Sequence, residues 1–245
     1  MNAASLHPRQ VPPQRIAFWL RAAWQDLRRN PVASLSYGLL FAIGGDLILL
    51  ASLNKPAVFF GALSAFFLLA PLLSAGLYVL SKQPGEIRFI DTLAYLAGRW
   101  RGLTQLGLLL ACAALLWERC SGQIFATLVG GDSVNALGLL KLLQMQSELH
   151  ATAALWLVSG GLIAVLAFAL TVIAVPLMVD RPFPFFAALR LSLQTVARNF
   201  FTLAVWAVII VLLTLLGYLT LLFGLIVLMP LLGHASWHAY RDLVE

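Results

Sequence analysis

Three charged residues lie inside long apolar stretches, where a charge is unusual. Asp46 falls within the apolar run 32–53, and Glu118 and Arg119 interrupt the run 103–129. A charge in bilayer hydrocarbon costs about 2.5 to 3.5 kcal/mol on insertion scales, so such residues often mark a polar site. Counted from the same side of a membrane, Asp46 and the neighbours Glu118 and Arg119 each lie roughly 20 to 25 Å along their helices. The sequence therefore predicts one intramembrane polar site at Asp46, Glu118 and Arg119.

We expect Asp46 and Arg119 to approach within salt-bridge distance or to share a polar cavity. Glu118 is the alternative partner of Arg119, but adjacent residues on a helix point about 100° apart, so we expect it to pair with Arg119 less well than Asp46 does. Two interpretations stay open. The charges either fix helix packing and reach toward the outer headgroups, or they bind a substrate or a proton.

Two histidines, His234 and His238, form the second group that could do chemistry. Their spacing puts both rings on one helix face, and such a pair can ligate a metal. No glutamate lies between them, so the metalloprotease motif is missing. Beside Trp237, Tyr240 and Arg241 they fit an aromatic belt at a membrane surface. The sequence predicts no cofactor and no metal, with these two histidines as the candidates if a metal does bind.

The composition requires lipid around most of the chain. Of 245 residues, 61% are hydrophobic and 11% are charged, whereas a soluble domain carries about 25% charged residues. The net charge of +6 comes from basic residues that flank the apolar runs, which is typical of contact with anionic headgroups and not with nucleic acid. Catalytic motifs are missing and the loops are short, so we expect no enzyme.

Five apolar runs are long enough to cross a bilayer, which takes about 20 residues. They cover residues 32–53, 57–80, 103–129, 151–179 and 200–233. The last run is too long for one span, and we split it at residues 217–220, where glycine and threonine favour a tight hairpin. The sequence thus predicts an all-α membrane protein with six transmembrane helices.

The distribution of lysine and arginine predicts the orientation. One side of the six-span arrangement carries Arg9, Arg15, Arg21, Arg28, Arg29, Lys82, Arg88, Arg99, Arg101, Arg181, Arg190, Arg198 and Arg241, and the other side carries Lys55, Arg119 and Lys141. Because basic loops stay in the cytoplasm, both chain ends are expected there.

The chain reads as three copies of an amphipathic elbow helix followed by a transmembrane hairpin. The elbows are residues 16–30, 87–101 and 185–199, and each hairpin's second helix carries a proline between apolar residues, at Pro71, Pro176 and Pro230. Proline frees a carbonyl and bends a helix. We expect a flexible cytoplasmic tail over residues 1–14 and a single six-helix membrane domain over 15–245. Glycines such as Gly38, Gly160 and Gly161 permit close helix approach.

Residues 24–31 (WQDLRRNP), residues 35–41 (LSYGLLF) and the closing motif PLLGHASWHAYRDL at 230–243 resemble an uncharacterised family of bacterial polytopic inner-membrane proteins. Some of its members are loosely labelled cytochrome-oxidase-like. The resemblance implies a multi-pass protein of the bacterial cytoplasmic membrane, and it brings no activity or catalytic residues.

These observations favour a non-enzymatic protein that binds or transports a small or lipidic molecule, or supports an envelope complex. The alternative is a metal- or haem-binding redox-associated membrane subunit that uses His234 and His238. The expected partners are the lipid bilayer, with anionic headgroups at the cytoplasmic face, and a membrane protein or a second copy of the chain.

Overall fold

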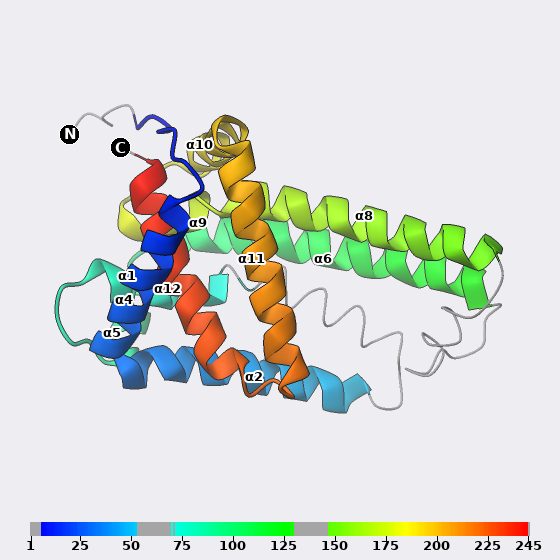
Figure 1. Cartoon of the computed structure of the whole chain (residues 1–245), viewed down its shortest axis with the longest axis horizontal. Helices are drawn as coiled ribbons and strands as arrows, with labels where there is room; N and C mark the ends of the chain where they lie inside the picture. Colours follow the sequence, from blue (N-terminus) through cyan, green and yellow to red (C-terminus); the bar gives the residue numbers. More distant parts are fainter. Residues whose placement is uncertain (1–5, 53–69, 71, 130–146, 245) are drawn as a thin grey trace. The chain divides into compact units, whose positions relative to one another are not determined.

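The structure is a computed structural model that describes residues 6–52, 70, 72–129 and 147–244. These residues form helices joined by short connections, with one isolated bridge between Pro8 and Val244, so the all-α prediction is confirmed for them (Figure 1). The helices are α1 (Arg15–Arg29), α2 (Pro31–Ser52), α4 (Ala75–Lys82), α5 (Phe89–Ala97), α6 (Trp100–Val129), α8 (Ser147–Thr171), α9 (Ala174–Asp180), α10 (Phe185–Arg198), α11 (Phe200–Leu219) and α12 (Leu225–Leu243).

The described residues fall into two compact units, and the single membrane domain expected over residues 15–245 stays a prediction. The first unit takes its residues from 1–43, 71–106 and 168–245, and the second takes them from 44–70 and 107–167. The first unit therefore contains α1, α4, α5, α9, α10, α11 and α12, together with the beginnings of α2 and α6. In the second unit, α6 and α8 lie side by side, with the rings of Trp117 and Trp156 5.8 Å apart between centroids.

Four stretches of the described chain are long and apolar enough to cross a membrane. They are Pro31–Ile48, Trp100–Ile124, Ala154–Asp180 and Phe200–Leu219, and they match the first, third and fourth predicted spans and the first half of the last run. Most of the second predicted span lies outside the described residues, as does Pro71. Helix α12, the sixth predicted span, is formed but is not among these four.

The last apolar run is broken into two helices at the predicted place. Helix α11 ends at Leu219 and α12 begins at Leu225, and the two helices pack against each other (Figure 1). The turn places Leu221 and Leu222 at positive φ, 53° and 69°, which is unusual for residues other than glycine. The hydroxyl of Thr220 compensates by accepting a hydrogen bond from the Gly224 N–H at 2.8 Å.

The three predicted amphipathic elbows are helices α1, α5 and α10. Each is followed almost directly by a long helix: α2 after Asn30, α6 after Gly98 and Arg99, and α11 after Asn199. Helix α1 shows why these segments form, because Ile16, Trp19, Ala23 and Leu27 recur at helical spacing and are buried. The edge of Trp19 packs on Trp206 of α11, with 5.9 Å between ring centroids.

Helix α8 is interrupted before Pro176, as expected for a proline in a spanning helix. Because proline has no N–H, the turn before it loses a hydrogen bond, and α8 ends at Thr171 while α9 begins at Ala174. Ser192 of the elbow α10 binds the backbone at this break. Its hydroxyl donates to the carbonyl of Ala169 at 2.7 Å and accepts from the N–H of Ile173 at 3.3 Å.

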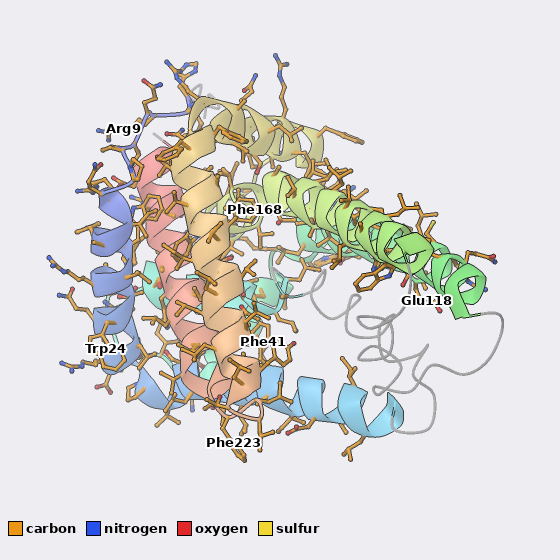
Figure 2. All side chains as sticks on the ribbon, turned by 45° about the vertical axis from the view of Figure 1, so that its right-hand side comes forward. Arg9, Trp24, Phe41, Glu118, Phe168 and Phe223 are labelled. Atoms are coloured by element: carbon orange, nitrogen blue, oxygen red, sulfur yellow. The ribbon has the colours of Figure 1, made fainter. Side chains whose placement is uncertain are left out.

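The segment before α1 is held by hydrogen bonds over part of the predicted flexible tail. The N–H of Arg9 donates to the carbonyl of Leu243 at 2.8 Å. The side-chain oxygen of Asn199 accepts from the N–H of Val11 at 2.8 Å, and Thr202 donates to the carbonyl of Val11 at 2.7 Å. The two ends of the described chain therefore lie together, with Arg9 beside the end of α12 (Figure 2).

Gly38 gives a stability test of the first unit. A methyl group added there would collide with the backbone carbonyl of Ile226, which cannot move cheaply, whereas one added at Gly161 of α8 would meet nothing. We predict that Gly38→Ala lowers the melting temperature of the detergent-purified protein, because overpacking costs about 1 to 3 kcal/mol. The control Gly161→Ala should leave it unchanged or raise it, since alanine favours helix. Equal effects of the two variants would show that α2 and α12 do not approach closely at Gly38.

Candidate polar site on helix α12

The last turns of α12 carry several polar residues that are buried in the first unit, among them His234 and Ser236. Helix α12 packs against α1, α4, α9 and α11, and in Figure 2 it runs alongside α1 and α11. Its polar residues from His234 to Asp242 contact side chains of α1, α2, α4 and α9. An unpaired polar group inside a protein costs about 1 to 3 kcal/mol, so these contacts determine which helices surround α12.

His234 is completely buried and hydrogen-bonded through both ring nitrogens. Its Nε2 lies 2.9 Å from the hydroxyl of Ser34 on α2, and its Nδ1 lies 2.7 Å from the hydroxyl of Ser81 on α4. Ser34 is also completely buried. This one side chain therefore joins three helices, α2, α4 and α12.

The polar contacts continue from Ser81 toward Asp26, because Ser81 is one of the groups that lower the pKa of the Asp26 carboxyl. We call these four residues, Asp26, Ser81, His234 and Ser34, the relay.

Asp26 is the anionic end of the relay, and it has two further partners. His238 Nε2 lies 2.8 Å from one carboxylate oxygen, and Arg29 Nη2 lies 2.8 Å from the other. Burial raises the pKa of Asp26, but the hydrogen bonds from His238 and Ser81 and the nearby positive charge outweigh it. The net effect lowers the pKa of Asp26, so this carboxyl group stays ionised.

A second buried carboxylate, Asp180 at the end of α9, has basic partners from three segments. Its Oδ1 lies 3.0 Å from Lys82 Nζ, and its Oδ2 lies 2.8 Å from Arg181 Nη2 and 3.8 Å from Arg241 Nη1. Tyr240 donates its hydroxyl to the same Oδ2 at 2.9 Å. We call these five residues, Lys82, Asp180, Arg181, Tyr240 and Arg241, the Asp180 cluster.

The Asp180 cluster has more positive than negative charge. Three cations surround one carboxylate, which is 7% exposed. The cations remain open to solvent, with side chains 27%, 46% and 56% exposed for Lys82, Arg181 and Arg241. Because these cations face solvent, an anion can bind to the cluster at the protein surface, and its charge does not have to be buried.

The one acidic residue of α12, Asp242, connects the helix to the start of α1. Its carboxylate accepts two hydrogen bonds from Arg15, at 2.8 and 2.9 Å, and one from the indole N–H of Trp19 at 2.9 Å. A bidentate arginine contact of this kind fixes orientation as well as distance. It therefore fixes the beginning of α1 against the end of α12.

The three charges singled out in the apolar runs lie in the second unit. Arg119 is paired with Glu118 at 3.7 Å, and both side chains are well exposed. Asp46 is exposed on α2 and has no ion pair with another described residue. The partner of Arg119 is thus its neighbour in sequence, whereas the sequence favours Asp46. Figure 2 shows Glu118 toward the far end of α6.

Sequence reasoning singled out His234 and His238 but missed Asp26 and Asp180. It placed both histidines in an interfacial belt, whereas His234 is completely buried and His238 is partly buried against Asp26. No three histidine, cysteine or acidic side chains come together as a metal-binding group within the part of the chain that is described. A usable signal for the missed acids was their position near the ends of predicted helices, with an arginine one or two residues later in the sequence.

The ionisation of Asp26 predicts how stability depends on pH. Because its pKa is lower in the folded than in the unfolded protein, its contribution is present above the unfolded value and is lost as the pH falls below about 4. We predict that Asp26→Asn lowers the melting temperature at pH 7, by the equivalent of about 2 kcal/mol for a charged hydrogen bond. The melting temperature of the variant should also fall less between pH 5 and pH 3 than that of the native protein. Parallel curves would contradict this role. Asp91→Asn serves as a control, because among the described residues Asp91 pairs with Arg88 alone, and both side chains are exposed.

Comparison with known families supports the membrane assignment directly. Residues 58–180, about half of the chain, match the model of a family described as predicted integral membrane protein (DUF2189). The match does not include the closing motif at 230–243. No curated protein and no solved structure matches the chain. The chain therefore belongs to the DUF2189 family of predicted integral membrane proteins.

Proposed function

We propose that this integral membrane protein crosses a bacterial cytoplasmic membrane six times and has both ends in the cytoplasm. The bridge between Pro8 and Val244 supports an even number of crossings, because residues that pair directly lie on the same side of a membrane. Beyond the four long apolar stretches, α4 supplies the end of the second proposed span and α12 supplies the sixth. The excess of lysine and arginine on the side that carries α1, α5 and α10 supports a cytoplasmic location for that side.

Hydrogen bonds between the three elbow units support the proposed repeat. Asn30, which follows the first elbow, accepts a hydrogen bond from the N–H of Ile87, just before the second elbow, at 2.9 Å. Asn199, which follows the third elbow, accepts from Val11, just before the first. The first unit thus holds the entry to the second, and the third unit holds the entry to the first, which is the pattern expected of related copies.

We further propose that the protein is non-enzymatic and binds a small or lipidic molecule at the Asp180 cluster. The observation that carries this proposal is the convergence of Lys82, Arg181 and Arg241 on one buried carboxylate. One cation is enough to neutralise the carboxylate, so the other two leave positive charge that an anionic ligand can neutralise. On the six-span topology they lie at the cytoplasmic surface, where both cytosolic solutes and lipid headgroups can reach them.

The contacts of the histidines bear on the alternative redox function. Both ring nitrogens of His234 face serine hydroxyls, and the Nε2 of His238 faces Asp26. A metal at either Nε2 would have to displace one of these partners and would break the relay. These contacts favour the binding function over a metal- or haem-binding subunit.

Native mass spectrometry of gently solubilised protein tests the two functions together. We predict a stoichiometric bound molecule that is lost in Arg181→Gln but kept in the control Arg190→Gln, which removes an exposed arginine of the elbow α10. Protein that carries no added mass under any condition would contradict the binding function. A metal or haem mass that disappears only in a double His234→Gln and His238→Gln variant would establish the redox alternative instead.

A further inference from the structure

We propose that the ligand of the Asp180 cluster is a phosphate monoester or inorganic phosphate, held mainly by Arg241 and Arg181. This inference rests on the proposed binding function and names its ligand class. The hydrogen bonds of a single oxygen atom, Asp180 Oδ2, and the charge that remains around it favour this ligand class.

The oxygen Oδ2 of Asp180 already has its full set of donors. Arg181 donates to it through Nε at 3.0 Å and Nη2 at 2.8 Å, and Tyr240 donates at 2.9 Å. A carboxylate oxygen has about two lone-pair sites. Further donors therefore cannot bind this oxygen well.

Arg241 is the donor left over at this oxygen. Its Nη1 lies 3.8 Å from Oδ2, which is too long for a hydrogen bond. The side chain is 56% exposed and donates to no other residue of the described chain. Its planar set of N–H donors is thus held close to the cluster by attraction to Asp180 but remains available to a ligand.

The outer donors of Arg181 are available in the same way. Its Nε and Nη2 contact Asp180, and the side chain is 46% exposed. Because Arg181 and Arg241 approach the same carboxylate oxygen, the two guanidinium groups repel each other with only one anion between them. A second anion that contacts both groups would relieve this repulsion.

The charge and the geometry favour a phosphate monoester over a carboxylate or a phosphodiester. Lys82, Arg181 and Arg241 exceed Asp180 by two positive charges. A phosphate monoester carries about −1.5 to −2 charges at pH 7 and has three acceptor oxygens. Arginine forks suit phosphate because two parallel N–H groups meet two oxygens. A carboxylate or a phosphodiester would supply only one negative charge.

Tyr240 and Lys82 keep the cluster in place for such a ligand. Lys82 also donates to the hydroxyl of Tyr95 at 3.0 Å, which ties it to the elbow α5. Tyr240 is 2% exposed, so its hydroxyl fixes the carboxylate of Asp180 from the protein side. The open side of Asp180 is therefore the side of Arg181 and Arg241. The same chemistry describes a free phosphate and the headgroup of a phosphatidic acid in the membrane.

The test measures phosphate binding by the full chain and two arginine variants. Melting temperature is followed during titration with inorganic phosphate at constant ionic strength, and again in nanodiscs of phosphatidylcholine with and without phosphatidic acid. We expect a saturable rise for the native protein with at least one of the two. Arg241→Gln should weaken this binding roughly tenfold or more, and Arg241→Lys should weaken it less, because lysine keeps the charge but loses the fork.

The control is Arg190→Gln, which removes the same charge from an exposed site outside the cluster and should bind like the native protein. Arg241→Gln should melt normally without ligand, since Arg241 makes no hydrogen bond to Asp180. A response to inorganic phosphate assigns a soluble ligand, and a response to phosphatidic acid alone assigns a lipid. No response to either, or equal weakening by the two glutamine variants, would overturn the proposal. A bound molecule without phosphate in native mass spectra would then leave the binding function standing and refute only this ligand class.

Discussion

The burial of polar groups at the end of α12 is the constraint on which the first unit depends. His234 and its partner Ser34 have no contact with solvent, and a buried polar group without a hydrogen bond costs about as much as a destabilising mutation. The partners must therefore come from neighbouring helices: Ser34 from α2, Ser81 from α4 and Asp26 from α1. Apolar packing alone would let these helices slide past one another, whereas the relay fixes both their depth and their rotation.

The same constraint relates the chain ends to the proposed repeat. Asp242 holds Arg15 and Trp19, and the carbonyl of Leu243 holds the backbone of Arg9, so the last helix closes on the first. Under the proposed repeat, the first unit binds the entry of the second, and the third unit binds the entry of the first. The Asp180 cluster then draws its cations from the ends of three different hairpins.

Hydropathy predicted the elements better than it predicted the site. The features that determine the helices and their breaks lie close together in the sequence. Long apolar runs predict α2, α6 and α11, and the two helix breaks are predicted by Gly217 with Thr220 and by Pro176. The pairing of Asp46 with Arg119 was inferred from depth alone. Depth does not say which way a residue points around its helix, and Glu118 lies nearer to Arg119. Asp26 and Asp180 seemed ordinary because their partners come from residues up to 212 positions away, and a single sequence does not reveal such pairs.

The most direct test of this account asks whether both chain ends lie on the same side of the membrane. The contacts that residues 8–11 make with helices α11 and α12 require that they do. Reporter fusions after Lys82, Arg181 and Glu245 would measure it, together with fusions near Lys55, Asp132 and Tyr218. The account predicts that the first three report the cytoplasm and the other three report the outside. An external carboxyl end with a cytoplasmic amino end would separate Pro8 from Val244 and contradict both the six-span topology and the assembly of the first unit around α12.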